Sequence, residues 1–402
     1  MANQKSELSH WLNAVFRKEH FLCSVQSITN RGGVQYSSTM DHLDALTAMD
    51  VLDLLEEEEE REERPPRMRV VPVHRDFLAL SNAAFLRHFR FTKAGFETLL
   101  GLIGAQLEHK DGRGGALSPA VQLQTALNHM AGAMFQRSTG LCFDGSQSAA
   151  RECLIKVCNA LLSLKGQWIY MPSVAEQART AEYGLARFGL PGISMAVDGV
   201  HCYFADTPRG VPAQIDELKV FWGRKARYSI NCQVVGNEHR ICDIDVQWPG
   251  STHDARIWKL SHAKHIIEEQ IEYKIAGDSG YPISQVLVKP YSAAEVNGNP
   301  RRRTFNRKLS GLRTVMTEDI FGRWKKRFPI LRNLRCHLEL SQKIIVTTAI
   351  LENIAHAWNV DQPDEDLPDP PHEGHVIIFD DSREATRTRG QVERDILLGR
   401  MR

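Results

Sequence analysis

Two aspartates in this chain of 402 residues each follow a short apolar run bounded by small or turn residues. Residues 192–197 lead to Asp198, and residues 273–277 lead to Asp278. Such runs are typical of buried strands. A buried carboxylate without a partner is costly, so each aspartate needs a cation, a shell of hydrogen bonds or solvent. A metal ion is one interpretation, and an aspartate that caps a turn at the strand end is the other.

A third carboxylate comes from a predicted helix. Glu318 precedes Ile320, Trp324 and Phe328, which recur at every fourth position and predict one apolar helical face. Glu318 should therefore lie near the start of this helix. If the two predicted strands lie side by side, two strand carboxylates and one helix carboxylate form an oxygen-rich site of the kind that Mg²⁺ or Mn²⁺ prefers.

Four segments, taken in order, resemble the motifs of one protein family. Residues 196–201, 248–255, 277–282 and 318–328 resemble the successive motifs of PIF/Harbinger transposases. The family includes the Harbinger-derived nuclease-like proteins of animals, and the resemblance extends over about residues 75–360. It implies a DDE endonuclease domain of RNase H-like fold.

The resemblance also implies roles for individual acids. Asp198, Asp278 and Glu318 match the catalytic acids, which would also hold two divalent ions, Mg²⁺ or Mn²⁺. The family aspartate that matches Asp254 opens a helix, where a carboxylate suits the helix N-terminus. Asp254 is therefore either an accessory acid of the site or a structural residue.

The sequence departs from the family pattern at two places. Glu352 stands before Asn353 and Ile354, where the family usually has a histidine. In addition, Asn306 and Glu318 are about one residue further apart than the family pattern predicts. The spacing from Glu318 to residue 328 still matches the family motif, so we expect Glu318 rather than Asp319 to be the third acid.

The implied reaction is metal-dependent cutting of phosphodiester bonds at transposon ends, followed by joining of the freed 3′-hydroxyl to target DNA. The protein would then be a hydrolase acting on DNA that also performs strand transfer. One alternative is a domesticated relative that binds DNA or protein without cleaving DNA. Another is a metal nuclease unconnected to transposition, which would cleave DNA ends without joining them.

The resemblance implies several partners as well. They are the terminal inverted repeats of a transposon, target DNA, a separate Myb/SANT-like DNA-binding protein, and further copies of the same chain. The Myb/SANT-like protein would supply sequence recognition and nuclear entry. We therefore expect the protein in the nucleus, and in the cytoplasm when that partner is absent.

Basic residues are concentrated in one part of the chain. The formal net charge is only +1, yet residues 301–335 contain twelve Lys or Arg and two acids. Because these residues are interleaved with the helix that carries Glu318, we predict a surface that contacts phosphates rather than a nuclear localisation signal. The predicted DNA-contacting residues are Arg224, Lys225, Arg301, Arg302, Arg303, Lys325 and Lys326.

The composition predicts four regions. Residues 1–66 form an N-terminal segment with an acidic linker, and residues 361–402 form an acidic, proline-rich and charged tail. Residues 67–190 are a small all-helical domain that is helix-turn-helix-like, or that simply packs against its neighbour. Residues 191–360 are the RNase H-like endonuclease domain, an α/β fold with a mixed sheet.

The elements of that domain follow from the apolar patterns. We predict antiparallel strands at about 192–198, 228–235 and 240–248, a helix over 253–270, and strands at 273–278 and 287–288. A long helix over 338–358 should cover the sheet.

The eight cysteines show no metal-binding or redox spacing, and no apolar run is long enough for a membrane span. We therefore expect reduced thiols and no membrane association.

Overall fold

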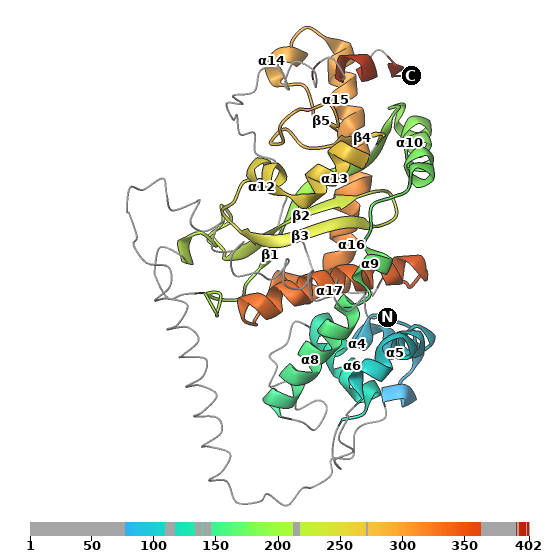
Figure 1. The fold of residues 1–402 in the computed structure, drawn as a ribbon, viewed down its shortest axis with the longest axis vertical. Helices are drawn as coiled ribbons and strands as arrows, with labels where there is room; N and C mark the ends of the chain where they lie inside the picture. Colours follow the sequence, from blue (N-terminus) through green and yellow to red (C-terminus); the bar gives the residue numbers. More distant parts are fainter. Residues whose placement is uncertain are drawn as a thin grey trace, which may run out of the picture.

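The structure is a computed structural model that describes residues 77–108, 117–132, 139, 146–211, 218–270, 272–362, 391, 394–398 and 400–401. The predicted N-terminal segment 1–66 and most of the predicted tail 361–402 lie outside these residues, so the predicted domain boundaries remain predictions. Figure 1 shows a central sheet with helices against both of its faces, and a group of helices at one end.

Within the described residues, five strands form one mixed sheet in the order β3-β2-β1-β4-β5. β1 pairs antiparallel with β2 and parallel with β4, β2 pairs antiparallel with β3, and β4 pairs parallel with β5. The predicted α/β class, mixed sheet and approximate strand positions are confirmed, but the predicted end of the first strand at Asp198 is wrong, because β1 continues to Tyr203 and keeps its pairing with β2 over this length. The strands are β1 (Ile193–Tyr203), β2 (Ser229–Gly236), β3 (Ile241–Pro249), β4 (Lys274–Ala276) and β5 (Leu287–Val288).

Helices cover both faces of this sheet. One face buries Met195 and Val197 of β1 against Trp258 of α12. The other face buries Val200 and Cys202 of β1 within a larger core that includes α16 and α17. Successive side chains of a strand point to opposite faces, which explains this alternation. The helices around the sheet are α12 (Asp254–Leu260), α13 (His262–Gln270), α14 (Ala293–Val296), α15 (Pro300–Arg313), α16 (Asp319–Arg327) and α17 (Leu338–Ala357), with the short η3 (Pro329–Arg332).

The predicted single helix over 253–270 is wrong, because the chain forms two helices that separate at Ser261. Ser261 has extended backbone angles (φ −74°, ψ 143°) and its Oγ accepts the amide of Lys264 at 3.3 Å. Serine side chains compete for backbone groups in this way and favour helix starts over helix interiors.

A π-helix joins α15 to α16. This element, η2 (Thr314–Glu318), adds one residue to the turn relative to an α-helix. It provides a structural account of the longer spacing between Asn306 and Glu318. Gly236 of β2 permits its close approach, because a Cβ atom there would lie 2.4 Å from the carbonyl oxygen of Met316.

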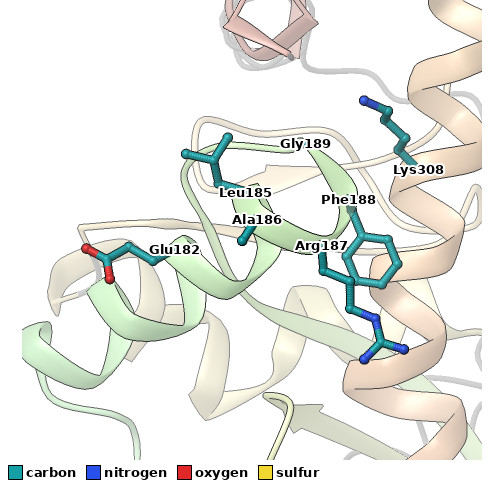
Figure 2. Close-up of a pocket in the computed structure, with 7 residues that line it drawn as sticks. All are labelled: Glu182, Leu185, Ala186, Arg187, Phe188, Gly189 and Lys308. Atoms are coloured by element: carbon teal, nitrogen blue, oxygen red, sulfur yellow. The ribbon is translucent and has the colours of Figure 1, made fainter.

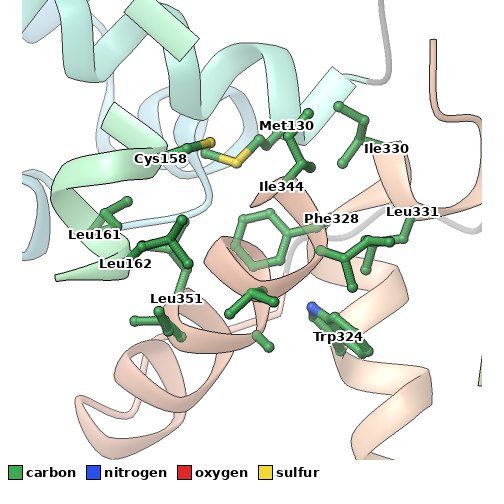
Figure 3. Close-up of a cluster of buried hydrophobic side chains, with 14 of the residues drawn as sticks. Met130, Cys158, Leu161, Leu162, Trp324, Phe328, Ile330, Leu331, Ile344 and Leu351 are labelled. Atoms are coloured by element: carbon green, nitrogen blue, oxygen red, sulfur yellow. The ribbon is translucent and has the colours of Figure 1, made fainter. Parts of the chain in front are cut away.

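The N-terminal helices share a core with the sheet domain. Met130 of α6 and Cys158 and Leu162 of α8 pack with Ile344 and Leu351 of α17 (Figure 3). This packing is the second of the two roles that the sequence left open, and a helix-turn-helix-like role remains a prediction. These helices are α4 (Asn82–Phe89), α5 (Lys93–Leu107), α6 (Pro119–Gly132), α8 (Gln147–Leu162), α9 (Lys165–Trp168) and α10 (Val174–Phe188), preceded by the short η1 (Phe77–Ala79).

A buried ion pair ties α16 to α17. Nε of Arg327 donates to Oε2 of Glu352 at 2.9 Å, and both side chains are 2% exposed. Arg327 also donates to the carbonyl oxygen of Arg90, at 3.1 Å, so it connects to the N-terminal helices. Glu352, the residue that departs from the family pattern, is therefore the counter-ion of a buried arginine.

Part of the predicted C-terminal tail packs beyond β5. The guanidinium of Arg394 lies 3.6 Å from the ring centroid of Tyr291 and pairs with Glu295 at 2.5 Å. The hydroxyl of Tyr291 donates to Asp395, and Leu397 is 4% exposed.

None of the described helices combines the length and apolar character that a membrane span requires. The cysteines in the described ranges form no disulfides.

Candidate active site

Asp198 lies in the middle of the long strand β1, on the face that packs against α15 and α16. Its Oδ1 accepts the amide of Gly199 at 2.9 Å, and its Oδ2 pairs with Nη2 of Arg313 at 2.7 Å. The Asp198 side chain is 16% exposed and that of Arg313 is 11% exposed. The carboxylate is thus largely buried and held by donors on both oxygens.

Asp278 reaches the same region because β4 lies parallel to β1. Ala276 pairs with Ala196, so Asp278 and Asp198 each follow the paired residue by two positions. Oδ1 of Asp278 accepts the amide of Gly280 at 2.8 Å, in the turn that follows the strand. The predicted juxtaposition of the two strands is confirmed.

Asp254 is the first residue of α12 and lies directly above β1. A Cβ atom on Gly199 would lie 2.4 Å from Oδ1 of Asp254, so this approach requires glycine. The same oxygen accepts Nδ2 of Asn231, in the neighbouring strand, at 2.8 Å. Asp254 therefore both begins a helix and faces the centre of the sheet.

Glu318 is the last residue of η2 and is exposed. Its Oε2 accepts the hydroxyl of Thr314 at 3.3 Å. It lies on the same helical segment as Arg313, and the two interact electrostatically. Its predicted position at the start of an apolar-faced helix is confirmed by the burial of Ile320, Trp324 and Phe328.

The electrostatics of the site link these residues. Burial raises the pKa of Asp198 from 3.8 to about 7; Arg313 opposes this shift, and Asp278 and Asp254 add to it. Burial also raises the pKa of Asp254, against the hydrogen bond from Asn231 and together with Asp278. Burial lowers the pKa of Arg313, but Asp198, Asp278 and Glu318 outweigh it and raise that pKa overall. One guanidinium thus interacts with all three predicted catalytic acids.

Comparison with known proteins places this constellation in a family. Residues 197–353 match the family described as DDE superfamily endonuclease. This part of the chain is similar to DDE endonuclease domains. The match begins one residue before Asp198 and includes Asp254, Asp278 and Glu318.

Curated relatives support the same assignment for a longer part of the chain. The rat protein named "Putative nuclease HARBI1" is 28% identical over 273 residues, which cover 65% of this chain and 74% of that protein. The mouse protein of the same name is 27% identical over 310 residues, covering 73% and 84%. "Protein ALP1-like" of Arabidopsis thaliana is 22% identical over 309 residues, covering 70% and 72%. The predicted relationship to Harbinger-derived nucleases is confirmed, and no solved structure matches the chain.

The donor chemistry of the DDE domain fits a divalent cation. Three aspartates interact with one another, and buried polar atoms beside them, Oη of Tyr281 and Oδ1 of Asn231, have no hydrogen-bond partner among the described residues. Such atoms call for water, an ion or a ligand. Across the described ranges, however, no three His, Cys, Asp or Glu side chains are already grouped as a metal site. Arg313 instead occupies Oδ2 of Asp198.

Two residues of the site were not predicted from sequence. Arg313 precedes Glu318 by five positions and resembles any other residue of a basic segment. Tyr281 follows Asp278 by three positions, and its buried ring interacts electrostatically with Asp198, Asp254 and Asp278. The contact of Arg313 with Asp198 has no signature in one sequence, because it joins α15 to β1 over 115 positions of the chain.

The predicted DNA-contacting residues occupy several places. Arg301 and Arg303 are exposed near the start of α15, whereas Arg302 packs over the ring of Tyr291 at 4.8 Å. Arg224 and Lys225 are exposed in a turn between β1 and β2. Lys325 lies 5.8 Å from the ring centroid of Tyr203, and Lys326 is half-buried on α16. Their roles in binding DNA remain predictions.

An open hollow lies away from these acids. It has a volume of about 530 Å³ and lies between α10 and α15 (Figure 2). It is lined by Glu182, Leu185, Ala186, Arg187, Phe188, Gly189 and Lys308. None of the predicted catalytic acids lines it, so it is separate from the DDE site.

Proposed function

We propose that this protein is a metal-dependent DNA endonuclease of the DDE type, built on an RNase H-like sheet. The observation that carries the proposal is the parallel pairing that brings Asp278 to the strand next to Asp198, whose partner Arg313 also interacts electrostatically with Asp278 and Glu318. Asp198 would be the acid shared by two divalent cations, with Asp278 and Glu318 completing their ligand sets. The bound cations would activate the attacking water and stabilise the leaving oxygen.

The residues of the chain prepare this site in several ways. The parallel pairing of β1 and β4 fixes the two strand aspartates on neighbouring strands. Gly199 and Asn231 hold Asp254 above β1, where it supports the site as an accessory acid. Burial of Asp198 lowers the local dielectric and strengthens its interaction with any cation that replaces Arg313.

Basic residues on both sides of the acids support DNA as the substrate. Arg301 and Arg303 lie near the opposite end of α15 from Arg313, about 18 Å and about 15 Å away at 1.5 Å per residue. Arg224 interacts electrostatically with Asp254 on the side of α12. A DNA strand bound at the acids would therefore have basic side chains near its phosphates on both sides of the scissile bond.

The test is cleavage of plasmid DNA with Mn²⁺ by the full chain and by Asp198→Asn, Glu318→Gln and Asp319→Asn. The first two variants should lose cleavage, while Asp319→Asn should cleave like wild type because its carboxylate is not assigned to the site. Added Mn²⁺ should stabilise wild type against heat and leave Asp198→Asn unchanged. Equal cleavage by wild type and Asp198→Asn would contradict the assignment of Asp198.

The ion pair between Arg313 and Asp198 favours a second candidate, a DNA- or protein-binding module that does not cleave. In that case the guanidinium would permanently neutralise the site. An inactive wild type that neither binds Mn²⁺ nor cleaves DNA, with transposon ends and a Myb/SANT-like partner present, would favour the module.

The resemblance to PIF/Harbinger transposases extends the proposal to strand transfer, self-association, a Myb/SANT-like partner and the nucleus. A strand-transfer assay with labelled transposon ends and a target plasmid tests the first of these. Joined products would support a transposase, and cleavage without joining would support a nuclease unconnected to transposition.

A further inference from the structure

A tight hairpin of basic residues lies at the C-terminal end of β1. Trp222 and Tyr228 form an isolated antiparallel bridge across it, and the amide of Gly223 donates to the carbonyl oxygen of Arg227 at 3.0 Å. The amide of Phe204 donates to the carbonyl oxygen of Tyr228 at 2.9 Å, which fixes the hairpin to the end of the strand. Residues 224–227, at the tip, are all exposed.

Trp222 is held in place but stays exposed. Its ring contacts the Tyr228 ring edge to face, with centroids 4.8 Å apart and planes at 73°. The Trp222 side chain nevertheless remains 48% exposed. A large aromatic ring that is braced on one side and open to solvent on another can stack on a ligand with little loss of side-chain entropy.

Two cations, Arg227 and Lys325, lie between the hairpin and α16 on either side of a buried aromatic ring, Tyr203, which is 5% exposed. The Arg227 guanidinium lies 4.5 Å and the Lys325 ammonium 5.8 Å from the ring centroid of Tyr203. The His201 ring stacks on the same tyrosine, with centroids 6.0 Å apart and planes at 18°. The buried Tyr203 ring therefore positions two cations between the exposed Trp222 and the helix that follows Glu318.

The hairpin also borders the acid site. Arg224 interacts electrostatically with Asp254 and, together with Lys225, with His201. Neither Arg224 nor Lys225 is within ion-pair distance of a carboxylate in the part of the chain that the structure describes. Their charges can therefore meet phosphates next to the acids.

We propose that this surface, which we call the hairpin platform, binds unpaired nucleotides of the DNA strand beside the bond that the acid site cuts. Phosphates would meet the cations, and a base would stack on Trp222. A paired duplex keeps its bases stacked inside and offers phosphates alone. The platform consists of Trp222, Arg224, Lys225, Arg227 and Tyr228, and the buried Tyr203 supports Arg227 from below.

This inference rests on the proposed endonuclease function, because the acid site determines which strand lies beside the hairpin. Its test does not depend on cleavage. Binding of the full chain is measured by fluorescence anisotropy in EDTA, with a blunt duplex and with the same duplex carrying an oligo-dT flank. The salt dependence of both affinities is recorded.

Wild type should bind the flanked duplex more tightly than the blunt one. Trp222→Ala should weaken binding of the flanked duplex by about 5- to 100-fold and leave the blunt duplex nearly unchanged, since stacking contributes about 1–3 kcal/mol per base. Trp222→Phe should keep most of the preference. The double variant Arg224→Glu with Lys225→Glu should weaken both probes and flatten their salt dependence.

Tyr170→Ala is the matched control. Tyr170 is 42% exposed and lies 3.7 Å below the guanidinium of Arg240, so it is also an exposed ring beside an arginine. Arg240 lies beyond the opposite end of β2 from the hairpin. This variant should bind both probes like wild type. Circular dichroism and thermal unfolding verify that every variant folds.

The outcomes separate the two proposals. Equal preference for the flanked duplex in wild type and Trp222→Ala would overturn the platform, whether or not the protein cleaves DNA. A Trp222-dependent preference in a protein that never cleaves with Mn²⁺ would support the platform and contradict the endonuclease. A wild type that binds neither probe would overturn both.

Discussion

Nη2 of Arg313 lies 2.7 Å from Oδ2 of Asp198, so the first acid of the DDE site is paired with a cation of the chain itself. Oδ1 of the same carboxylate accepts the amide of Gly199. A divalent ion on Oδ2 and the guanidinium therefore exclude each other. Arg313 stabilises a cluster of acids that would otherwise repel one another.

Arg313→Gln should therefore raise the affinity for Mn²⁺. Removal of a competing positive charge at contact distance predicts a gain of about tenfold or more. Isothermal titration calorimetry with Mn²⁺ measures the effect, and Arg307→Gln, an exposed arginine of the same helix, is the control. Weaker binding by Arg313→Gln would show that Arg313 orders the acids for the metal instead of competing with it.

The stability of Asp198→Asn relative to wild type should depend on pH. Burial raises the pKa of Asp198 to about 7 in the folded protein, against the opposing effect of Arg313. A pKa that is higher in the folded state gives stability that is present below pH 3.8 and is lost as pH rises through 7. Asparagine does not ionise, so the free energy of unfolding of Asp198→Asn does not fall for this reason. Relative to wild type, the variant should therefore become more stable as the pH rises between these values.

Urea unfolding in EDTA, from pH 4 to pH 8.5, measures that difference, which should reach roughly 1–3 kcal/mol above pH 7. Asp206→Asn, at an exposed aspartate, is the control for the substitution itself. A difference that stays constant over this range would show that Asp198 is ionised throughout and fully compensated by Arg313.

Much of the site was predictable because strand patterns fix neighbours. The apolar runs before Asp198 and Asp278 predicted two buried strands, and the parallel register of β1 with β4 places both acids at equivalent positions. Arg313 was not predictable, because its contact crosses from α15 to β1 over 115 positions of the chain. The division of residues 253–270 into two helices at Ser261 was not predicted. In the sequence, a serine that caps a helix cannot be distinguished from a polar residue within a longer helix.

The longer spacing before Glu318 leads to a prediction about η2. Deletion of Val315 should convert the π-turn to an α-turn and leave the residues on both sides in register. The variant should therefore fold with stability close to that of wild type. Deletion of Ser310, an exposed residue within regular α15, is the control and should rotate the following segment by about 100° and abolish folding. Yield of folded protein and urea unfolding distinguish the two deletions, and equal loss in both would contradict this account of η2.

Glu352 should matter for stability although it lies outside the acid site. Glu352→Ala would leave Arg327, a buried guanidinium, without its counter-ion, at a cost of about 3–5 kcal/mol. Glu339→Ala removes an exposed glutamate of the same helix, 68% exposed, that pairs with Lys343; it should cost less than about 1 kcal/mol. Urea unfolding compares them. Similar small losses would mean that backbone carbonyl groups alone satisfy Arg327.

The basic start of α15 should contact DNA through only two of its three arginines. Arg301 and Arg303 are exposed, whereas Arg302 packs on Tyr291 and its Nη1 donates to the carbonyl oxygen of Glu295 at 3.3 Å. Arg301→Glu with Arg303→Glu should weaken binding to all DNA sequences about equally. The slope of log affinity against log salt should fall by about 2, as expected for two lost phosphate contacts.

Arg302→Glu is the informative comparison for this pair, because it changes the same charge on the same helix turn. It should lower the unfolding temperature through the lost contact with Tyr291, and it should reduce the salt slope less than the double variant does. Anisotropy titrations over a range of salt concentrations, run beside thermal unfolding, give both quantities. If the double variant keeps the DNA affinity of wild type but no longer enters the nucleus, this segment is an import signal and the phosphate-contact hypothesis is wrong.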